Sequence, residues 1–181
     1  MADLLTIASM RRAQDSSLSP VDIRCLAGIF AFAWLAILLA VPLPASANDD
    51  LERLLAQPDA PDGVIFEIVE SDEDALQELL PRVRIAIEKI RARFPQTEFA
   101  VVSHGREEFA LQTQYQAENA QIHQQVQSLV SEDVPVHVCE THAGWYGVSA
   151  EDFPAYVNVS PTGPGQIRLY QELGYELIVV E

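Results

Sequence analysis

Apolar residues alternate between short runs of strand length and stripes of helical spacing, beginning at residue 64. Residues 64–69 (VIFEIV) form a nearly continuous apolar run, which is typical of a buried strand. We expect Ser71 to cap the helix that follows, with Asp74 three residues on. Pro81 should kink this helix or begin a second one. The apolar stripe of the helix consists of Leu76, Leu80, Val83, Ile87, Ile90 and Phe94.

The same alternation continues through the rest of the sequence. Gly174 suits the left-handed residue that ends a last helix. Because parallel strands need crossover connections, the alternation predicts a single α/β domain over residues 63–181. Its sheet should be five-stranded and mainly parallel, with helices on both faces, as in flavodoxin-like folds. The further strands are expected at 99–102, 134–139, 156–159 and 175–180, and the helices at 122–130, 141–146 and 166–173.

The first 47 residues have the pattern of a secretory signal peptide. Arg11, Arg12 and Arg24 precede an uncharged apolar stretch at 26–41, and Ala45-Ser46-Ala47 follows it. We expect cleavage after Ala47, because the apolar stretch is shorter than the ~20 residues of a comfortable membrane span. The alternative is an uncleaved membrane anchor. The mature chain is then predicted to be periplasmic, with no membrane contact, and to begin with a flexible tether over residues 48–62.

Charge and cysteine content exclude several classes of function. The chain has 181 residues, with 11 Lys and Arg against 27 Asp and Glu, for a formal net charge of −16. This field repels phosphate, so nucleic acid is not an expected partner. The two cysteines, Cys25 and Cys139, are too few for a disulfide scaffold or a four-cysteine zinc site. Cys25 should leave with the signal peptide, so Cys139 is the only thiol of residues 48–181.

In an open parallel sheet, ligands bind beyond the carboxyl ends of the strands, where four segments should meet. Residues 70–74 (ESDED) would repel the phosphate of a flavin or dinucleotide, but they could bind a divalent cation or complement a helix dipole. The segment 160–165 (SPTGPG) could bind a small anion or act as a rigid turn. From this segment and from 103–105 and 139–142, we expect ligand contacts by Ser103, Gly105, Thr141, Ser160, Thr162 and Gly163.

Cys139 is the strongest candidate for chemistry. It ends a predicted strand and precedes a predicted helical turn, whose amides can stabilise a thiolate. His142 can stabilise the thiolate further if it reaches the sulfur, whereas Glu140 acts in the opposite direction. The alternative is a buried, inert cysteine that packs as a small apolar side chain. A zinc or copper site is a weaker alternative, with ligands from His137, Cys139, His142 and His104.

Three segments carry a resemblance to a known family. VVSHG (101–105), VPVHVCETHAGWYGVSAEDF (134–153) and VNVSPTGPGQIRLYQELGYELIVV (157–180) resemble the DsrE/DsrF-like proteins of sulfur relay. The resemblance covers about residues 64–180. It implies a five-stranded α/β fold, assembly into trimers or hexamers, and sulfane sulfur carried as a persulfide on Cys139. It also implies sulfur donor and acceptor proteins as partners and no cofactor, and we expect from their positions that His104 and His142 stabilise the charged intermediate.

Two functions of different classes therefore remain open. The preferred prediction is an exported protein that binds or relays sulfane sulfur on Cys139, as a sulfurtransferase-like carrier. The alternative is a periplasmic oligomeric module that binds a small ligand or a metal at the same edge without catalysis. In a third, purely structural reading, Cys139 is buried and inert.

Overall fold

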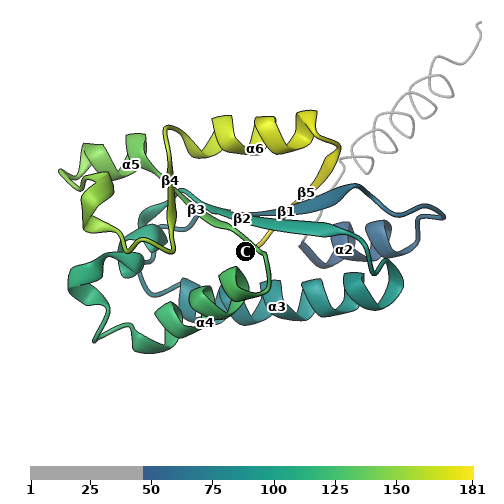
Figure 1. Ribbon diagram of the computed structural model, residues 1–181, viewed down its shortest axis with the longest axis horizontal. Coiled ribbons are helices and arrows are strands. Elements are labelled where there is room, and N and C mark those ends of the chain that lie inside the picture. Colours follow the sequence, from purple (N-terminus) through teal and green to yellow (C-terminus); the bar gives the residue numbers. More distant parts are fainter. Residues whose placement is uncertain (1–46) are drawn as a thin grey trace, which may run out of the picture. The chain divides into compact units, whose positions relative to one another are not determined.

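A five-stranded parallel sheet forms the centre of the protein. The computed structural model describes residues 47–181 (Figure 1), so the predicted signal peptide lies outside the described residues except for Ala47. The strand order is β4-β3-β2-β1-β5, and every neighbouring pair is parallel. This topology confirms the predicted α/β fold class. The strands are β1 (Gly63–Ile68), β2 (Glu98–Ser103), β3 (Val136–Cys139), β4 (Asn158–Ser160) and β5 (Tyr175–Val179).

Helices cover both faces of the sheet, as predicted. Helices α3 (Leu76–Arg93) and α4 (Ala120–Ser131) lie on one face, and α6 (Gly163–Glu172) lies on the other (Figure 1). No helix within residues 47–181 combines the length and the apolar character needed to cross a membrane. The short helices are α5 (Glu140–Trp145) and the 3-10 helices η1 (Arg106–Leu111), η2 (Thr113–Tyr115) and η3 (Ala150–Asp152).

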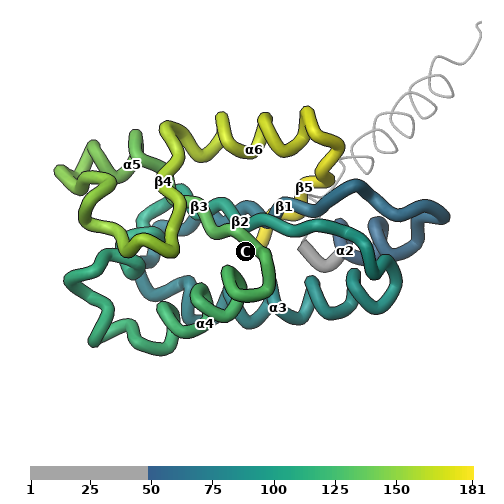
Figure 2. Tube along the Cα trace, viewed as in Figure 1, coloured from purple at the N-terminus to yellow at the C-terminus, as the bar shows by residue number. Residues whose placement is uncertain are grey.

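All five strands are parallel, so their carboxyl ends lie at one end of the sheet, which is the end where ligands bind in such folds. Strands β1 to β4 follow one another across the sheet, and α6 then carries the chain back to β5 beside β1. The strand order reverses at β1, beside β5, whereas the carboxyl ends of β3 and β4 lead into α5 and α6. Figure 2 shows that the segment after β2, helix α5 and the start of α6 gather at this end of the sheet. We call this end of the sheet, formed by the carboxyl ends of β1 to β4 and the segments that follow them, the carboxyl edge.

The two faces of the sheet bury unequal cores. Beneath the face that carries α3 and α4 lies a large apolar core, which includes Phe66, Ile87 and Val138. The face under α6 has a small apolar cluster, made of Ile65, Ala100, Val102 and Ile167. Because successive strand residues point to opposite faces, His137 and Cys139 of β3 share the α6 face.

The expected flexible tether at 48–62 is wrong for its first part. Residues Ala47–Leu55 form helix α2, in which Leu51 and Leu54 are buried in the large core. Gln57, just after the helix, donates a hydrogen bond from Nε2 to Glu176 Oε2 on β5 at 3.0 Å. The apolar residues of this segment recur at helical spacing, and their burial outweighs the polar composition that suggested a tether.

The predicted beginning of α3 is also wrong. The helix begins at Leu76, with Ala75 at the N-cap position and no side-chain cap, so Ser71 does not cap it. A turn intervenes, in which Asp72 Oδ1 accepts a hydrogen bond from the amide of Asp74 at 3.0 Å. A single helix runs through Pro81, so no second helix begins there.

Helix α6 begins earlier than predicted and ends at Glu172, one residue before the predicted end. Its first residue is Gly163 rather than Gln166, because Thr162 Oγ1 caps the helix by accepting a hydrogen bond from the Gly165 amide at 3.1 Å. Gly174 follows the last turn with φ at 90°, which confirms the predicted left-handed position.

We predict that α2 contributes to stability as part of the core. Leu54 is 2% exposed, so Leu54→Ala should lower the free energy of unfolding by about 2–5 kcal/mol, through lost burial and the cavity left behind. Ile85→Ala is the control, because Ile85 of α3 is 53% exposed and should change stability by less than about 0.5 kcal/mol. Urea unfolding of both variants measures the difference. Equal, small effects would show that α2 does not pack on the domain.

Candidate functional site

Cys139 lies at the carboxyl edge, where β3 passes into α5. It is 4% exposed, and its Sγ accepts a hydrogen bond from the backbone amide of His142 at 3.3 Å. This contact follows from the abrupt change from strand to helix, because Cys139 occupies the N-cap position of α5. The predicted stabilisation of the sulfur by a helix amide is therefore present. Cys139 is also buried, as in the inert alternative.

A buried carboxylate joins Cys139 to His142. Glu108, on η1, is fully buried. Its Oε2 accepts a hydrogen bond from the Cys139 amide at 2.8 Å, and its Oε1 lies 2.8 Å from His142 Nδ1. Glu108 thus fixes both the backbone of the cysteine and the ring of the histidine. The three residues form the cluster that we call the Cys139 site.

Glu107, the neighbour of Glu108, is also fully buried and holds together the ends of two strands. Its Oε1 accepts hydrogen bonds from Ser103 Oγ at 2.7 Å and from the Gly105 amide at 3.0 Å. Its Oε2 accepts from the Glu70 amide at 2.7 Å. A Cβ at position 105 would lie 2.5 Å from the Glu70 carbonyl oxygen, so the approach of these segments requires glycine there.

The environment of Glu108 favours its neutral form. Burial raises the pKa of Glu108 to about 7, because a carboxylate loses its hydration inside the protein. The hydrogen bonds with Cys139 and His142 act in the opposite direction, and the neighbouring Glu107 adds to the increase. Glu108 therefore changes protonation near neutral pH while it contacts the Cys139 amide and His142.

Aromatic rings surround His142. Its ring stacks on Phe109 with 5.5 Å between centroids and also contacts Tyr146 at 5.3 Å and Trp145 at 5.7 Å. Trp145 is 75% exposed and Tyr146 is 54% exposed. A cavity of about 420 Å³ is bordered by Phe109 and Tyr146, so it adjoins the ring of His142.

The structure separates His104 from this hydrogen-bond network. His104 Nε2 lies 2.8 Å from Glu67 Oε1 of β1, and the ring packs against Gly163 at the start of α6. The sequence predicts that His104 and His142 act together on the charged sulfur. Each is instead paired with a different carboxylate.

The side chains predicted to contact a ligand make contacts within the protein. Thr141 Oγ1 donates to the Pro161 carbonyl oxygen at 2.7 Å, and Ser160 Oγ bonds to His137 Nδ1 at 2.9 Å. Thr162 caps α6, and Gly163 adjoins His104. Together with the bonds from Ser103 and Gly105 to Glu107, these contacts hold the edge in shape.

The predicted metal ligands do not assemble. Within residues 47–181, no three His, Cys, Asp or Glu side chains are placed to hold a metal ion. His137 uses both ring nitrogens, with Ser160 Oγ at 2.9 Å and Tyr170 Oη at 3.0 Å. Burial lowers the pKa of His137 to about 4, so it stays neutral at physiological pH.

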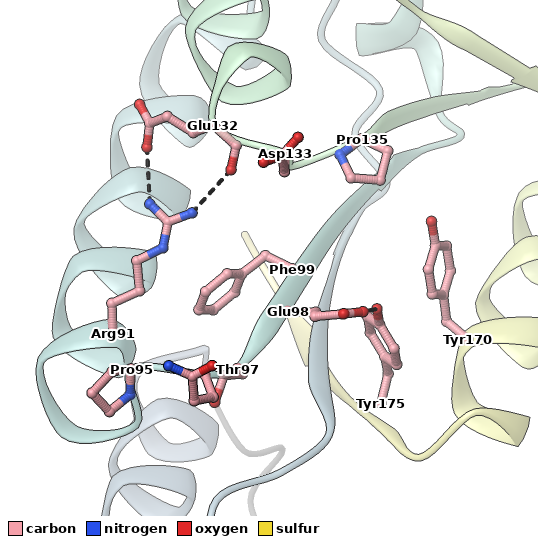
Figure 3. Close-up of a pocket in the computed structure, with 11 residues that line it drawn as sticks. Arg91, Pro95, Thr97, Glu98, Phe99, Glu132, Asp133, Pro135, Tyr170 and Tyr175 are labelled. Carbon is pink, nitrogen blue, oxygen red and sulfur yellow. Dashed lines mark hydrogen bonds and ion pairs between the residues drawn. The ribbon is translucent and has the colours of Figure 1, made fainter.

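A second hollow lies at the amino ends of the strands (Figure 3). Its volume is about 460 Å³, and it does not include any residue of the Cys139 site. Arg91 on its wall pairs with Glu132 at 2.9 Å, and Tyr175 Oη donates to Glu98 Oε2 at 2.5 Å. Its charged side chains are therefore largely satisfied by one another.

Glu107 and Glu108 are not among the site residues predicted from the sequence. They stand in a segment, REEFAL, that has the composition of a solvated loop. The available signal is their position, because they follow the predicted strand end at 103–105 and precede the apolar residues 109–111. In the structure this segment is η1, in which Glu107, Glu108 and all three apolar residues are buried.

Comparison with known proteins shows the fold alone. No protein-family model and no curated protein matches the chain. A solved structure from Methanobacterium thermoautotrophicum, the protein of unknown function MTH1491, has a TM-score of 0.52 and 23% identity over 64% of this chain and 96% of its own. A second, the conserved protein of unknown function BT1422 from Bacteroides thetaiotaomicron, has a TM-score of 0.42 and 11% identity over 64% of this chain and 93% of its own.

We predict that Glu108 makes stability depend on pH near neutrality. The folded-state pKa of Glu108, about 7, exceeds the ordinary value of 4.5. Its favourable contribution to the free energy of unfolding is therefore complete below pH 4.5 and is lost as the pH rises through 7. Glu108→Gln imitates the neutral acid and removes this loss. Between pH 4.5 and pH 7, the free energy of unfolding of the variant minus that of the wild type should rise by about 1.4 kcal/mol per pH unit.

Urea unfolding at a series of pH values measures this difference. Glu88→Gln is the matched control, because Glu88 is an exposed residue of α3, and the same substitution there should give a difference that does not change with pH. A flat difference for Glu108→Gln would mean that Glu108 is ionised throughout and that its burial is compensated.

Proposed function

We propose that this protein is an exported member of the DsrE/DsrF-like family that carries sulfane sulfur as a persulfide on Cys139. The observation that supports it most strongly is the Cys139 site itself. A lone structural cysteine needs no acid and no imidazole, whereas Glu108 contacts both the Cys139 amide and His142 Nδ1 at 2.8 Å. A buried carboxyl with a perturbed pKa in contact with a thiol-bearing residue is typical of reactive sites.

The proposed transfer is a thiol exchange without net oxidation. The Cys139 thiolate attacks the outer sulfur of a donor persulfide, R–S–SH. The new Sγ–S bond forms as the S–S bond of the donor breaks, and the donor leaves as R–SH after it takes up the proton released by Cys139. An acceptor thiolate then removes the outer sulfur by the same exchange and restores the Cys139 thiol.

The described residues supply three parts of this step. The His142 amide donates to Sγ at 3.3 Å and stabilises negative charge on it. Glu108 and His142 share a proton between Oε1 and Nδ1, 2.8 Å apart, and Glu108 also contacts the backbone amide of Cys139. Phe109 covers one face of the imidazole and restricts its motion. Because His104 pairs with Glu67, we assign it the role of fixing the edge rather than of contacting sulfur.

Export and self-assembly belong to the same proposal. The signal-peptide pattern at 26–47 supports transfer to the periplasm, with cleavage after Ala47. Leu169 on α6 and Leu173 just after it are 56% and 67% exposed, and such apolar side chains suit a contact with a second copy of the chain. We propose a trimer or a hexamer, in which donor and acceptor proteins approach the carboxyl edge.

A binding module without catalysis is the second candidate. The observation that favours it is the burial of Cys139, at 4% exposed, beside a site whose cavity of about 420 Å³ can accept a small molecule. In this case Cys139 would be a structural residue behind the cavity, which is lined by Phe109 and Tyr146 rather than by the cysteine. The two functions differ in whether the thiol reacts in the folded protein.

We predict that polysulfide adds sulfur to the mature chain at one position. Cys139 is the only cysteine of residues 48–181, so the intact mass should increase by one or more sulfur atoms and return to its original value after reduction. Cys139→Ser should keep its circular dichroism spectrum and show no increase. An unchanged mass for the wild type, with a thiol that reacts only after unfolding, would contradict the persulfide carrier and support the binding module.

A further inference from the structure

The carboxyl edge carries many acids and few basic side chains. Arg168 of α6 is one of them, because its Nη2 would lie 3.8 Å from a Cβ at position 165. In the segments that follow β1 to β4, residues 69–74, 104–115, 139–152 and 160–165, Arg106 is the only Lys or Arg. Arg106 forms an ion pair with Glu73, so its charge is already neutralised. The exposed acids of these segments are Asp72, Glu73, Asp74, Glu140, Glu151 and Asp152.

These acids are close enough to act on the Cys139 site. Parallel strands lie about 4.8 Å apart, so the end of β1 is about 10 Å from the end of β3, which is comparable to the Debye length at physiological ionic strength. Side-chain contacts make the connection closer. The guanidinium of Arg106, paired with Glu73, lies 5.7 Å from the centroid of the Tyr146 ring, and that ring contacts His142 at 5.3 Å.

Within the described part of the chain, the interior of the site supplies no free positive charge to the sulfur. Glu107 and Glu108 are fully buried beneath the edge, and the imidazole of His142 is engaged with Glu108. Glu140, exposed, follows Cys139 directly in the chain. A thiolate at Cys139 therefore has no free cationic side chain in the four segments to balance it, and an incoming group with positive charge would supply that balance.

We infer that the carboxyl edge selects a sulfur donor that carries positive charge beside its sulfur and disfavours anionic donors. This inference rests on the proposed function and names the class of its donor. Ammonium or guanidinium groups next to the persulfide are attracted by the acidic edge. Inorganic polysulfides and other sulfur anions are repelled and react more slowly, although polysulfide in excess still loads the thiol. The chemical class includes a small aminothiol persulfide and a cysteine persulfide flanked by Lys or Arg on a protein.

Disulfides of different charge test the selection. The thiolate of Cys139 attacks one sulfur, a mixed disulfide forms as the S–S bond of the probe breaks, and the other half leaves as a thiolate without net oxidation. The probes are cystamine, a dication; bis(2-hydroxyethyl) disulfide, which is neutral; and 3,3′-dithiodipropionate, a dianion. The rate of mixed-disulfide formation on the mature chain is followed by intact mass, at low and at high salt.

Cystamine should react at least ~10-fold faster than the dianion at low salt, and the ratio should fall toward one at high salt. The double variant Glu140→Gln/Glu151→Gln should lower this ratio. Glu88→Gln, with a charge change on α3 outside the four segments, should leave it unchanged. A fourth probe, the disulfide of a cysteine peptide flanked by lysines, separates the two sources. A faster reaction with this peptide than with cystamine indicates a protein donor, and a faster reaction with cystamine indicates a small-molecule donor.

Each contrary result has a distinct meaning. If the three probes form mixed disulfides at equal rates, or if the dianion reacts fastest, the inferred selection for positive charge is wrong. The proposed function is then still supported, because Cys139 reacts in the folded protein. If no probe reacts with the folded chain while the unfolded chain reacts with all of them, Cys139 is inert and the proposed function and the selection are both overturned.

Discussion

Two adjacent buried carboxyl groups hold the carboxyl edge of this sheet together. Glu107 accepts three hydrogen bonds from groups that follow or end β1 and β2, and Glu108 contacts the Cys139 amide and His142 Nδ1. A buried carboxylate without such partners would cost several kcal/mol, so the surrounding backbone must supply donors. The positions of Cys139 and His142 follow from this requirement, because η1 places both acids beneath the strand ends.

The same constraint shapes the chemistry that the edge can perform. Burial raises the pKa of Glu108 to about 7, and burial lowers the pKa of His137 to about 4. On the α6 face, therefore, His137 is a neutral structural group that links β3 to β4 and α6 through Ser160 and Tyr170. Glu108 contacts both His142 Nδ1 and the Cys139 amide, so its change of protonation acts on both residues of the site.

The sequence was sufficient to predict the sheet, because its strands are apolar runs and its helices have clear stripes, and Gly174 marked a helix end correctly. It was insufficient for α2, where only a few leucines at helical spacing signal burial within a polar segment. Cys139 and His142 could be placed at the edge from their spacing alone. Glu107 and Glu108 could not, since acidic neighbours are usually solvated and only the tertiary structure turns both inward.

The most direct test of the central claim, that Glu108 governs the Cys139 site, is the rate of alkylation of Cys139 by iodoacetamide as a function of pH. This reagent is neutral, so the acidic edge does not bias it. We predict that the wild-type profile has an inflection near pH 7, where Glu108 ionises, and that Glu108→Gln lacks it while retaining the fold. Identical profiles for the two proteins would contradict the claim and would leave Glu108 with a structural role alone.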